Sequence, residues 1–250
     1  MEDLKNFRQL NSRTPGHPEV ETPGVEIGTG PLGQGVSNAV GMAIAEANLA
    51  ATFNKENFPV FDNYIFALCG DGCLEEGISH EAASLAGHLG LGRLIILYDD
   101  NSITIDGRTD LNFTEDVLKR YEAYGWDVQR VVDGNHDVNG ILKAIQHAKE
   151  TTDKPSIIAV KTIIGYGSSV ENTSGVHGSP LGWDKIDAVR AKFGFEAGKY
   201  FEVAEDVVKF YREAGERGTK KAAEWTAMME QYKQQFPADV RVYCFVLFVV

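Results

Sequence analysis

The chain has 250 residues and an apolar content of 43%, which is enough to bury one large hydrophobic core, so a single domain is expected. The formal net charge of -12 argues against a nucleic-acid or anionic-membrane surface, because clustered Lys and Arg normally bind such partners. Cys69, Cys73 and Cys244 form no CxxC pair, a pattern typical of free thiols in a reducing compartment.

Strand and helix patterns alternate along the chain. Residues 1–30 are rich in Pro and Gly and predict a loop, without the apolar stretch of a signal peptide, and a helix is expected to begin near Gln34. Apolar runs predict buried strands at residues 64–68 and 94–98, and two further strands are predicted at 128–132 and 156–161. Helices are predicted through 82–89, 114–124 and 138–150, the first of them after a loop at 70–77. This alternation predicts an α/β fold, a doubly wound parallel sheet with helices on both faces.

The last third of the chain has a different pattern. A long loop that contains several glycines, residues 164–180, is typical of a binding loop, and helices are expected at 184–193 and 204–234. Residues 240–250 are apolar and β-prone, but too few to span a bilayer as a helix. They predict either a buried strand or an exposed, aggregation-prone end produced by truncation or an altered reading frame.

Two predicted strands end in residues that suit a metal and a diphosphate. Gly70-Asp71-Gly72 follows the strand at 64–68, and Asn101 follows the strand at 94–98. Ligands of open parallel sheets bind at the carboxyl ends of neighbouring strands. A carboxylate and an amide oxygen suit Mg²⁺ or Ca²⁺, and the glycines let the backbone approach a phosphate. Alone, the first motif also fits a tight turn, but its position one crossover before Asn101 favours a metal-diphosphate site.

Several further segments resemble the transketolase family and occur in that family's order. These segments are residues 12–19 (SRTPGHPE), 29–35 (TGPLGQG), 68–77 (LCGDGCLEEG), 103–107 (ITIDG), 164–167 (IGYG) and 176–178 (VHG). The resemblance runs from about residue 7 to about residue 236, and it covers an incomplete amino-terminal, diphosphate-binding domain. We therefore expect a partial domain at 1–236 and an atypical apolar tail at 237–250.

The resemblance implies a cofactor, a reaction and partners. Thiamine diphosphate, held through Mg²⁺ or Ca²⁺, would transfer a two-carbon ketol unit from a ketose phosphate to an aldose phosphate. The full-length form would be a homodimer without nucleic-acid or membrane partners. In transketolases the Glu that activates the cofactor belongs to a second domain of the other subunit, so this chain alone is expected to be inactive. The compartment would be the cytoplasm, or a plastid if a transit peptide is missing here.

The resemblance also implies roles for individual residues. The metal ligands would be Asp71, Asn101 and the backbone carbonyl of Ile103. The cofactor would be held by Gly30, Pro31, Leu32, Gly70, Asp71, Gly72, Asn101 and His177. The catalytic set would be His17 and His177 near the reacting end of the cofactor, with Glu76 and Glu81 linking two active sites across the dimer.

Less specific interpretations stay open for the same residues. Residues 30–33 also fit a helix-entry turn, loop histidines are usually solvated, and Glu76 and Glu81 also fit surface charges or cap partners. Three identities remain for the chain: a piece of a transketolase, a non-catalytic remnant that binds metal diphosphate or partners, and a relative such as dihydroxyacetone synthase.

Overall fold

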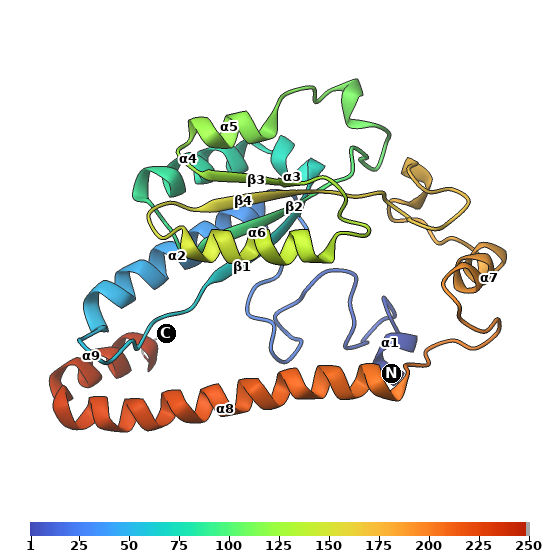
Figure 1. Cartoon of the computed structure of the whole chain (residues 1–250). Helices are drawn as coiled ribbons and strands as arrows, with labels where there is room; N and C mark the ends of the chain where they lie inside the picture. Colours follow the sequence, from blue (N-terminus) through green and yellow to red (C-terminus); the bar gives the residue numbers. More distant parts are fainter. Residues whose placement is uncertain (249–250) are drawn as a thin grey trace. The chain divides into compact units, whose positions relative to one another are not determined.

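The computed structural model describes residues 1–248, with side chains described through residue 242. Its strands and helices alternate through the first two thirds of the chain, and helices follow (Figure 1). The strands are β1 (Ile65–Gly70), β2 (Leu94–Asp100), β3 (Asp127–Val131) and β4 (Ser156–Lys161). The α-helices are α1 (Glu2–Lys5), α2 (Gln34–Phe53), α3 (Asp71–Glu75), α4 (Gly77–Leu89), α5 (Val117–Ala123), α6 (Val138–Glu150), α7 (Trp183–Lys192), α8 (Glu205–Gln235) and α9 (Pro237–Phe248). Short 3-10 helices are η1 (Thr109–Leu111) and η2 (Ser174–Val176).

The chain forms two compact units, residues 1–44 with 64–201, and residues 45–63 with 202–250. The first unit contains a four-stranded sheet in the order β1-β2-β4-β3. Every neighbouring pair of strands is parallel. The predicted α/β fold is confirmed, because each strand is joined to the next by a crossover that contains a helix.

Helices cover both faces of this sheet, but unequally. On one face, α2, α4 and α5 pack against the sheet through a core that includes Val40, Ala83 and Tyr121. On the other face, α6 packs through Ala144 and Ala148 over β2, β3 and β4 (Figure 1). This arrangement leaves β1 uncovered on the α6 side, where Leu68 is 85% exposed. The expectation that residues 64–68 form a fully buried strand is therefore wrong for one face.

Two local predictions need correction. Residues 70–77 are not a loop, since α3 occupies most of this segment and its Leu74 is completely buried. Burial of one apolar side chain stabilises a helical turn that the glycines around it disfavour. α5 begins three residues later than predicted, because the Asp116 side chain accepts a hydrogen bond of 3.2 Å from the Lys119 amide and so caps the helix there.

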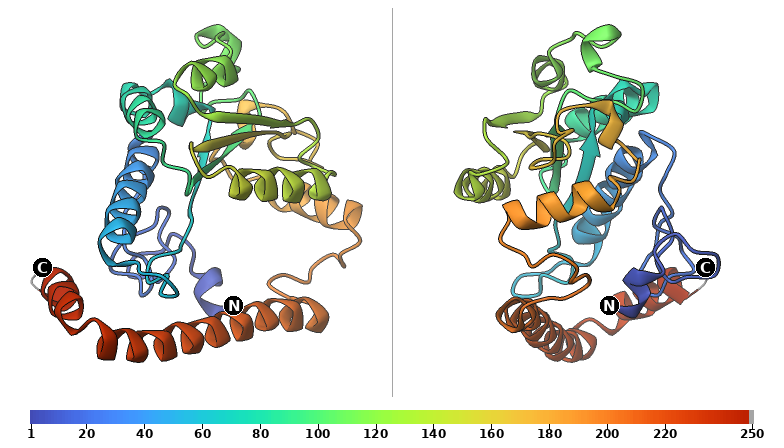
Figure 2. Two further views of the ribbon diagram at one scale, coloured as in Figure 1. Left: turned by 60° about the vertical axis from the view of Figure 1, so that its left-hand side comes forward. Right: turned by 90° about the vertical axis from the view of Figure 1, so that its right-hand side faces the viewer.

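The second unit is helical, and it overturns the strand predicted near the end of the chain. α8 is one long continuous helix, and the helix α9 follows it (Figure 2). Pro237 stands at the first position of α9, where its fixed φ favours a helix. Asp239 in the first turn pairs with Lys55 at 3.0 Å and accepts a hydrogen bond from the Tyr232 hydroxyl. The exposure predicted for the apolar tail concerns mainly side chains beyond 242, which lie outside the described residues.

Candidate metal and diphosphate site

The register of β1 and β2 brings the two predicted ligands to one edge of the sheet. Gly70, the last residue of β1, is paired with Asp99 of β2. Asp71 and Asn101 therefore leave neighbouring parallel strands at nearly the same level. Both side chains are buried, with 4% of Asp71 and 8% of Asn101 exposed. Buried polar groups at the carboxyl edge of such a sheet are typical of a ligand site.

The Asp71 carboxylate accepts hydrogen bonds from Tyr98 and from the backbone that follows β2. The Tyr98 hydroxyl donates to Oδ1 at 2.5 Å, and the Ser102 amide donates to Oδ2 at 3.0 Å. Burial raises the pKa of the Asp71 carboxyl, and these two hydrogen bonds oppose that rise by stabilising the charged form. Each oxygen keeps a second lone pair, so the carboxylate can still ligate a cation.

The Asn101 amide is oriented in the same way. Its Nδ2 donates to Asp99 Oδ2 at 3.2 Å, and its Oδ1 accepts from the Ile103 amide at 2.9 Å. Ser102, between them, has a φ of 63°, a left-handed conformation that costs free energy in a residue with a side chain. That conformation accompanies the hydrogen bond from the Ser102 amide to Asp71. Hydrogen bonds thus link Asp71, at the start of α3, to the loop after β2 that carries Asn101 and Ile103.

Two cations neutralise the neighbouring carboxylate of Asp100. Arg130 approaches it at 2.8 Å and Lys161 at 3.2 Å. Lys161 also donates to the Ser102 hydroxyl at 2.7 Å, which ties the strained residue to β4. Sequence reasoning did not assign Tyr98, Asp99, Ser102 or Lys161 to the site. The only signal for the first three was their place beside Asn101 at a strand end.

Glycines mark where three segments of the predicted cofactor site meet. A Cβ added at Gly72 would lie 3.1 Å from Leu32 Cδ1, and one added at Gly30 would lie 3.1 Å from the His17 ring. At Gly33, φ is +78° and a Cβ would lie 2.7 Å from Glu76 Cβ. The structure therefore brings together three segments: His17, residues 30–33, which include Pro31, and the starts of α3 and α4. A side chain at any of these three glycines would press against the neighbouring segment, so their absence of a side chain allows the close approach.

The other three predicted residues, Glu76, Glu81 and His177, are exposed. Glu81 is exposed on α4, and Glu76 is the N-cap residue of that helix. His177 follows η2 and is exposed. A Cβ at Gly165, whose φ is +64°, would lie 2.8 Å from Val176, so the two ends of the long predicted loop pack together there.

A protein-family comparison decides where this chain belongs. The family described as transketolase, thiamine diphosphate binding domain, matches residues 1–243. The chain belongs to the transketolase family. Transketolase 2 of Saccharomyces cerevisiae is 56% identical over 238 residues, which are 95% of this chain and 35% of that protein. The transketolase of Nostoc sp. is 55% identical over 241 residues, 96% of this chain and 36% of that protein.

Solved transketolase structures agree in fold. The enzyme from Leishmania mexicana gives a TM-score of 0.95 at 48% identity over 98% of this chain and 37% of that one. A Pichia stipitis transketolase complexed with sedoheptulose-7-phosphate gives 0.95 at 48% identity, over 97% of this chain and 36% of that one. This chain thus spans about a third of the length of the transketolases that it matches.

The donors of the transketolase-family chain suit a hard cation. In the described part of the chain no three His, Cys, Asp or Glu side chains cluster as a metal site. A set of one carboxylate, one amide oxygen and one backbone carbonyl needs no such cluster, and it leaves positions for diphosphate oxygens and water. The donor set therefore fits a metal-bound diphosphate. A polar hollow of about 350 Å³ also opens beside Asp71, but its lining includes the carboxylates of Asp100, Glu115 and Asp116 and not Asn101, so it does not mark the diphosphate position.

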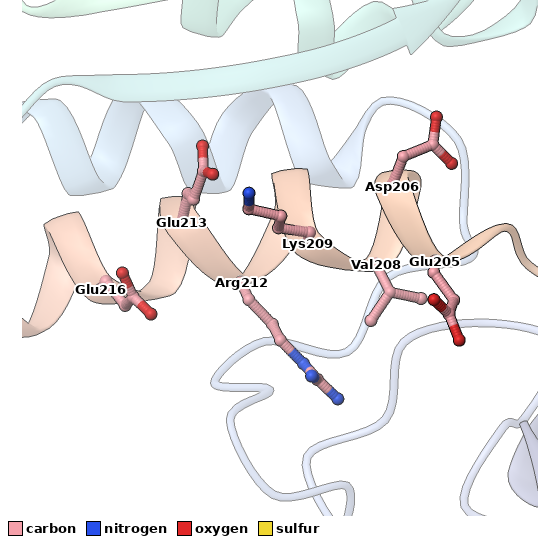
Figure 3. A pocket seen from close by; sticks show the side chains of 7 residues that line it. All are labelled: Glu205, Asp206, Val208, Lys209, Arg212, Glu213 and Glu216. Carbon is pink, nitrogen blue, oxygen red and sulfur yellow. The ribbon is translucent and has the colours of Figure 1, made fainter.

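A second hollow of about 730 Å³ in the transketolase-family chain lies along the start of α8 (Figure 3). It is lined by Glu205, Asp206, Val208, Lys209, Arg212, Glu213 and Glu216. All seven come from one helix, and Figure 3 shows Arg212 and Glu213 pointing to opposite sides. Binding sites need polar groups that converge, so we read this surface as a solvated helix face. Among the described helices, none is both long and apolar enough to cross a membrane.

Proposed function

We propose that this chain supplies the metal- and diphosphate-binding half of a thiamine diphosphate-dependent transketolase. The full-length protein would transfer a two-carbon ketol unit from a ketose phosphate to an aldose phosphate. The observation that carries the proposal is the buried pair of Asp71 and Asn101 at adjacent strand ends, in a chain of the transketolase family. Mg²⁺, or Ca²⁺, would be bound by these two side chains and by the Ile103 carbonyl.

The residues around the metal would bind the cofactor. Thiamine diphosphate, when bound, supplies the carbon nucleophile for a ketose carbonyl. Gly70 and Gly72 would give backbone access to the diphosphate, and His177 would donate a hydrogen bond to it. Leu32, with residues 30–31 beside it, would offer an apolar surface to the ring. His17, which packs against Gly30, would hydrogen-bond a sugar hydroxyl and transfer a proton during the reaction.

Partners and compartment complete the proposal. Sugar phosphates as substrates are supported by the complex of the Pichia stipitis relative with sedoheptulose-7-phosphate. We propose a homodimer for the full-length form, with Glu76 and Glu81 facing the partner, in the cytoplasm or a plastid. A non-catalytic remnant and a dihydroxyacetone synthase would share this site, and no feature of the described residues favours either of them.

Metal removal tests the proposed site directly. The chain is expected to bind thiamine diphosphate in the presence of Mg²⁺ and to lose this binding when EDTA removes the metal, because the chain has no cluster of basic side chains to hold the diphosphate. Isothermal titration calorimetry with and without EDTA measures the difference. Re-addition of Mg²⁺ should restore binding, and an affinity that EDTA leaves unchanged would contradict the proposal.

The two loop histidines are expected to matter for turnover more than for folding. In the full-length protein, His17→Ala and His177→Ala should each lower ketol transfer by about 10²-fold, the usual contribution of general acid-base catalysis. Both side chains are exposed, so neither change should lower the melting temperature by much. His88→Ala, on the exposed side of α4, is the matched control. Normal activity per folded molecule combined with a lower melting temperature would make the histidines structural.

A further inference from the structure

Among the residues whose side chains the structure describes, Tyr98 is the one buried residue whose hydroxyl contacts a predicted metal ligand. Its ring is part of the core between the sheet and α2, α4 and α5, and only 4% of the residue is exposed. Its hydroxyl lies 2.5 Å from Asp71 Oδ1. A short hydrogen bond to a carboxylate is among the stronger ones in proteins, and a buried hydroxyl without a partner would destabilise the fold.

The position of Tyr98 on β2 makes it a rigid donor. β2 is hydrogen-bonded to β1 on one side and to β4 on the other. The second donor to Asp71, the Ser102 amide, belongs to the loop after this strand and contacts the other carboxylate oxygen. Two donors on opposite oxygens fix both the direction and the plane of the carboxylate. Of the two, the Tyr98 hydroxyl is the one that a substitution can remove without altering the backbone.

We propose that Tyr98 is a positioning residue for the metal, because its hydroxyl holds the Asp71 carboxylate in the orientation that an octahedral cation requires. This inference rests on the proposed function, since it concerns the same metal site. Groups that hydrogen-bond metal ligands typically change metal affinity by about 10–100-fold when they are removed. Mg²⁺ demands near-ideal octahedral geometry, whereas Ca²⁺ accepts irregular arrangements. Loss of the Tyr98 hydrogen bond to this carboxylate should therefore weaken Mg²⁺ binding more than Ca²⁺ binding.

The experiment compares the wild-type chain with Tyr98→Phe, which removes only the hydroxyl. Calorimetric titrations of thiamine diphosphate with Mg²⁺, and separately with Ca²⁺, give an apparent affinity for each metal. Tyr98→Phe is expected to lower the Mg²⁺ affinity by about 10-fold or more and the Ca²⁺ affinity by less. The ratio of Mg²⁺ affinity to Ca²⁺ affinity should therefore fall. Thermal melting and circular dichroism establish how far each variant is folded.

Tyr121→Phe is the matched control. Tyr121 is buried in the same core, and its hydroxyl has no hydrogen-bond partner among the described residues. This variant should leave both metal affinities unchanged. An equal loss of Mg²⁺ and Ca²⁺ affinity in Tyr98→Phe with a lower melting temperature would mean that the residue acts only through the core, and would overturn the inference. Unchanged affinities would overturn it too.

A second comparison separates this inference from the proposed function. Wild-type binding that disappears in Asp71→Ala but persists in full in Tyr98→Phe would refute the positioning role and leave the metal site intact. A wild-type chain that takes up no thiamine diphosphate with either metal, even at millimolar concentrations, would refute the proposed function and the inference together.

Discussion

Replacement of Asp71 by Ala is expected to abolish metal-dependent binding of thiamine diphosphate. Asp71 is the only charged group among the three predicted ligands, since Asn101 and the Ile103 carbonyl are neutral. Without its carboxylate the cation would keep two neutral protein ligands, too few for a site that must also attract a diphosphate. Calorimetric titration of the variant with thiamine diphosphate and Mg²⁺ should give no measurable heat of binding.

The same substitution leaves two donors without an acceptor. The Tyr98 hydroxyl and the Ser102 amide both bond to Asp71, and an unsatisfied buried donor costs about 1–3 kcal/mol of folding free energy. A loss of stability must therefore be separated from a loss of ligation. Asp71→Asn keeps the size and one oxygen, and should still bind far more weakly because the charge is gone. Asp110→Ala, which removes an exposed carboxylate, should bind normally. Undiminished affinity of Asp71→Ala for thiamine diphosphate and Mg²⁺ would contradict the assignment of Asp71 as a metal ligand.

Alternating apolar runs were sufficient to predict the sheet, because they reflect burial on the two faces of parallel strands. The helix predicted at 138–150 has the same first and last residues as α6. Its start is fixed by Asp137, whose side chain accepts a hydrogen bond of 2.8 Å from the Gly140 amide and so caps the first turn. The errors arose where tertiary contacts override local preference. α3 exists because Leu74 is buried, and α9 exists although its residues favour strands, because Pro237 and Asp239 stabilise its first turn.

The site was predictable to the extent that it depends on strand ends. The order of the chain placed Asp71 and Asn101 after consecutive predicted strands, and the register then made them neighbours. The contacts of Tyr98 and Lys161 depend on which face of β2 and β4 each side chain occupies. A single sequence gives that face only after the register is known, so these residues were missed. The contact between His17 and Gly30 joins two irregular loops, whose path no periodicity predicts.

Binding and turnover are expected to separate in this chain: the 250 residues alone should bind the cofactor weakly and show no ketol transfer. The predicted contact surface is open, since 54% of Leu32 is exposed and both loop histidines lie at the surface. A catalytic site must hold its reactants in place and exclude water, and positioning alone can contribute about 7 kcal/mol or more. The resemblance to transketolases further implies that the Glu which activates the cofactor belongs to a second domain of the other subunit.

A ketose-to-aldose transfer assay on the purified chain, with thiamine diphosphate and Mg²⁺, measures this directly. Transketolase 2 of Saccharomyces cerevisiae, of which the chain matches 35%, serves as the positive control under the same conditions. Calorimetry on the same sample shows whether the cofactor is bound, so that an empty site is distinguished from an occupied but inactive one. The resemblance implies an activating Glu on a second domain, and the loss of proton transfer and of positioning would multiply, so the expected rate is zero within error instead of merely slow. Turnover of about 10 s⁻¹, a typical enzyme rate, would show that the chain contains a complete active site.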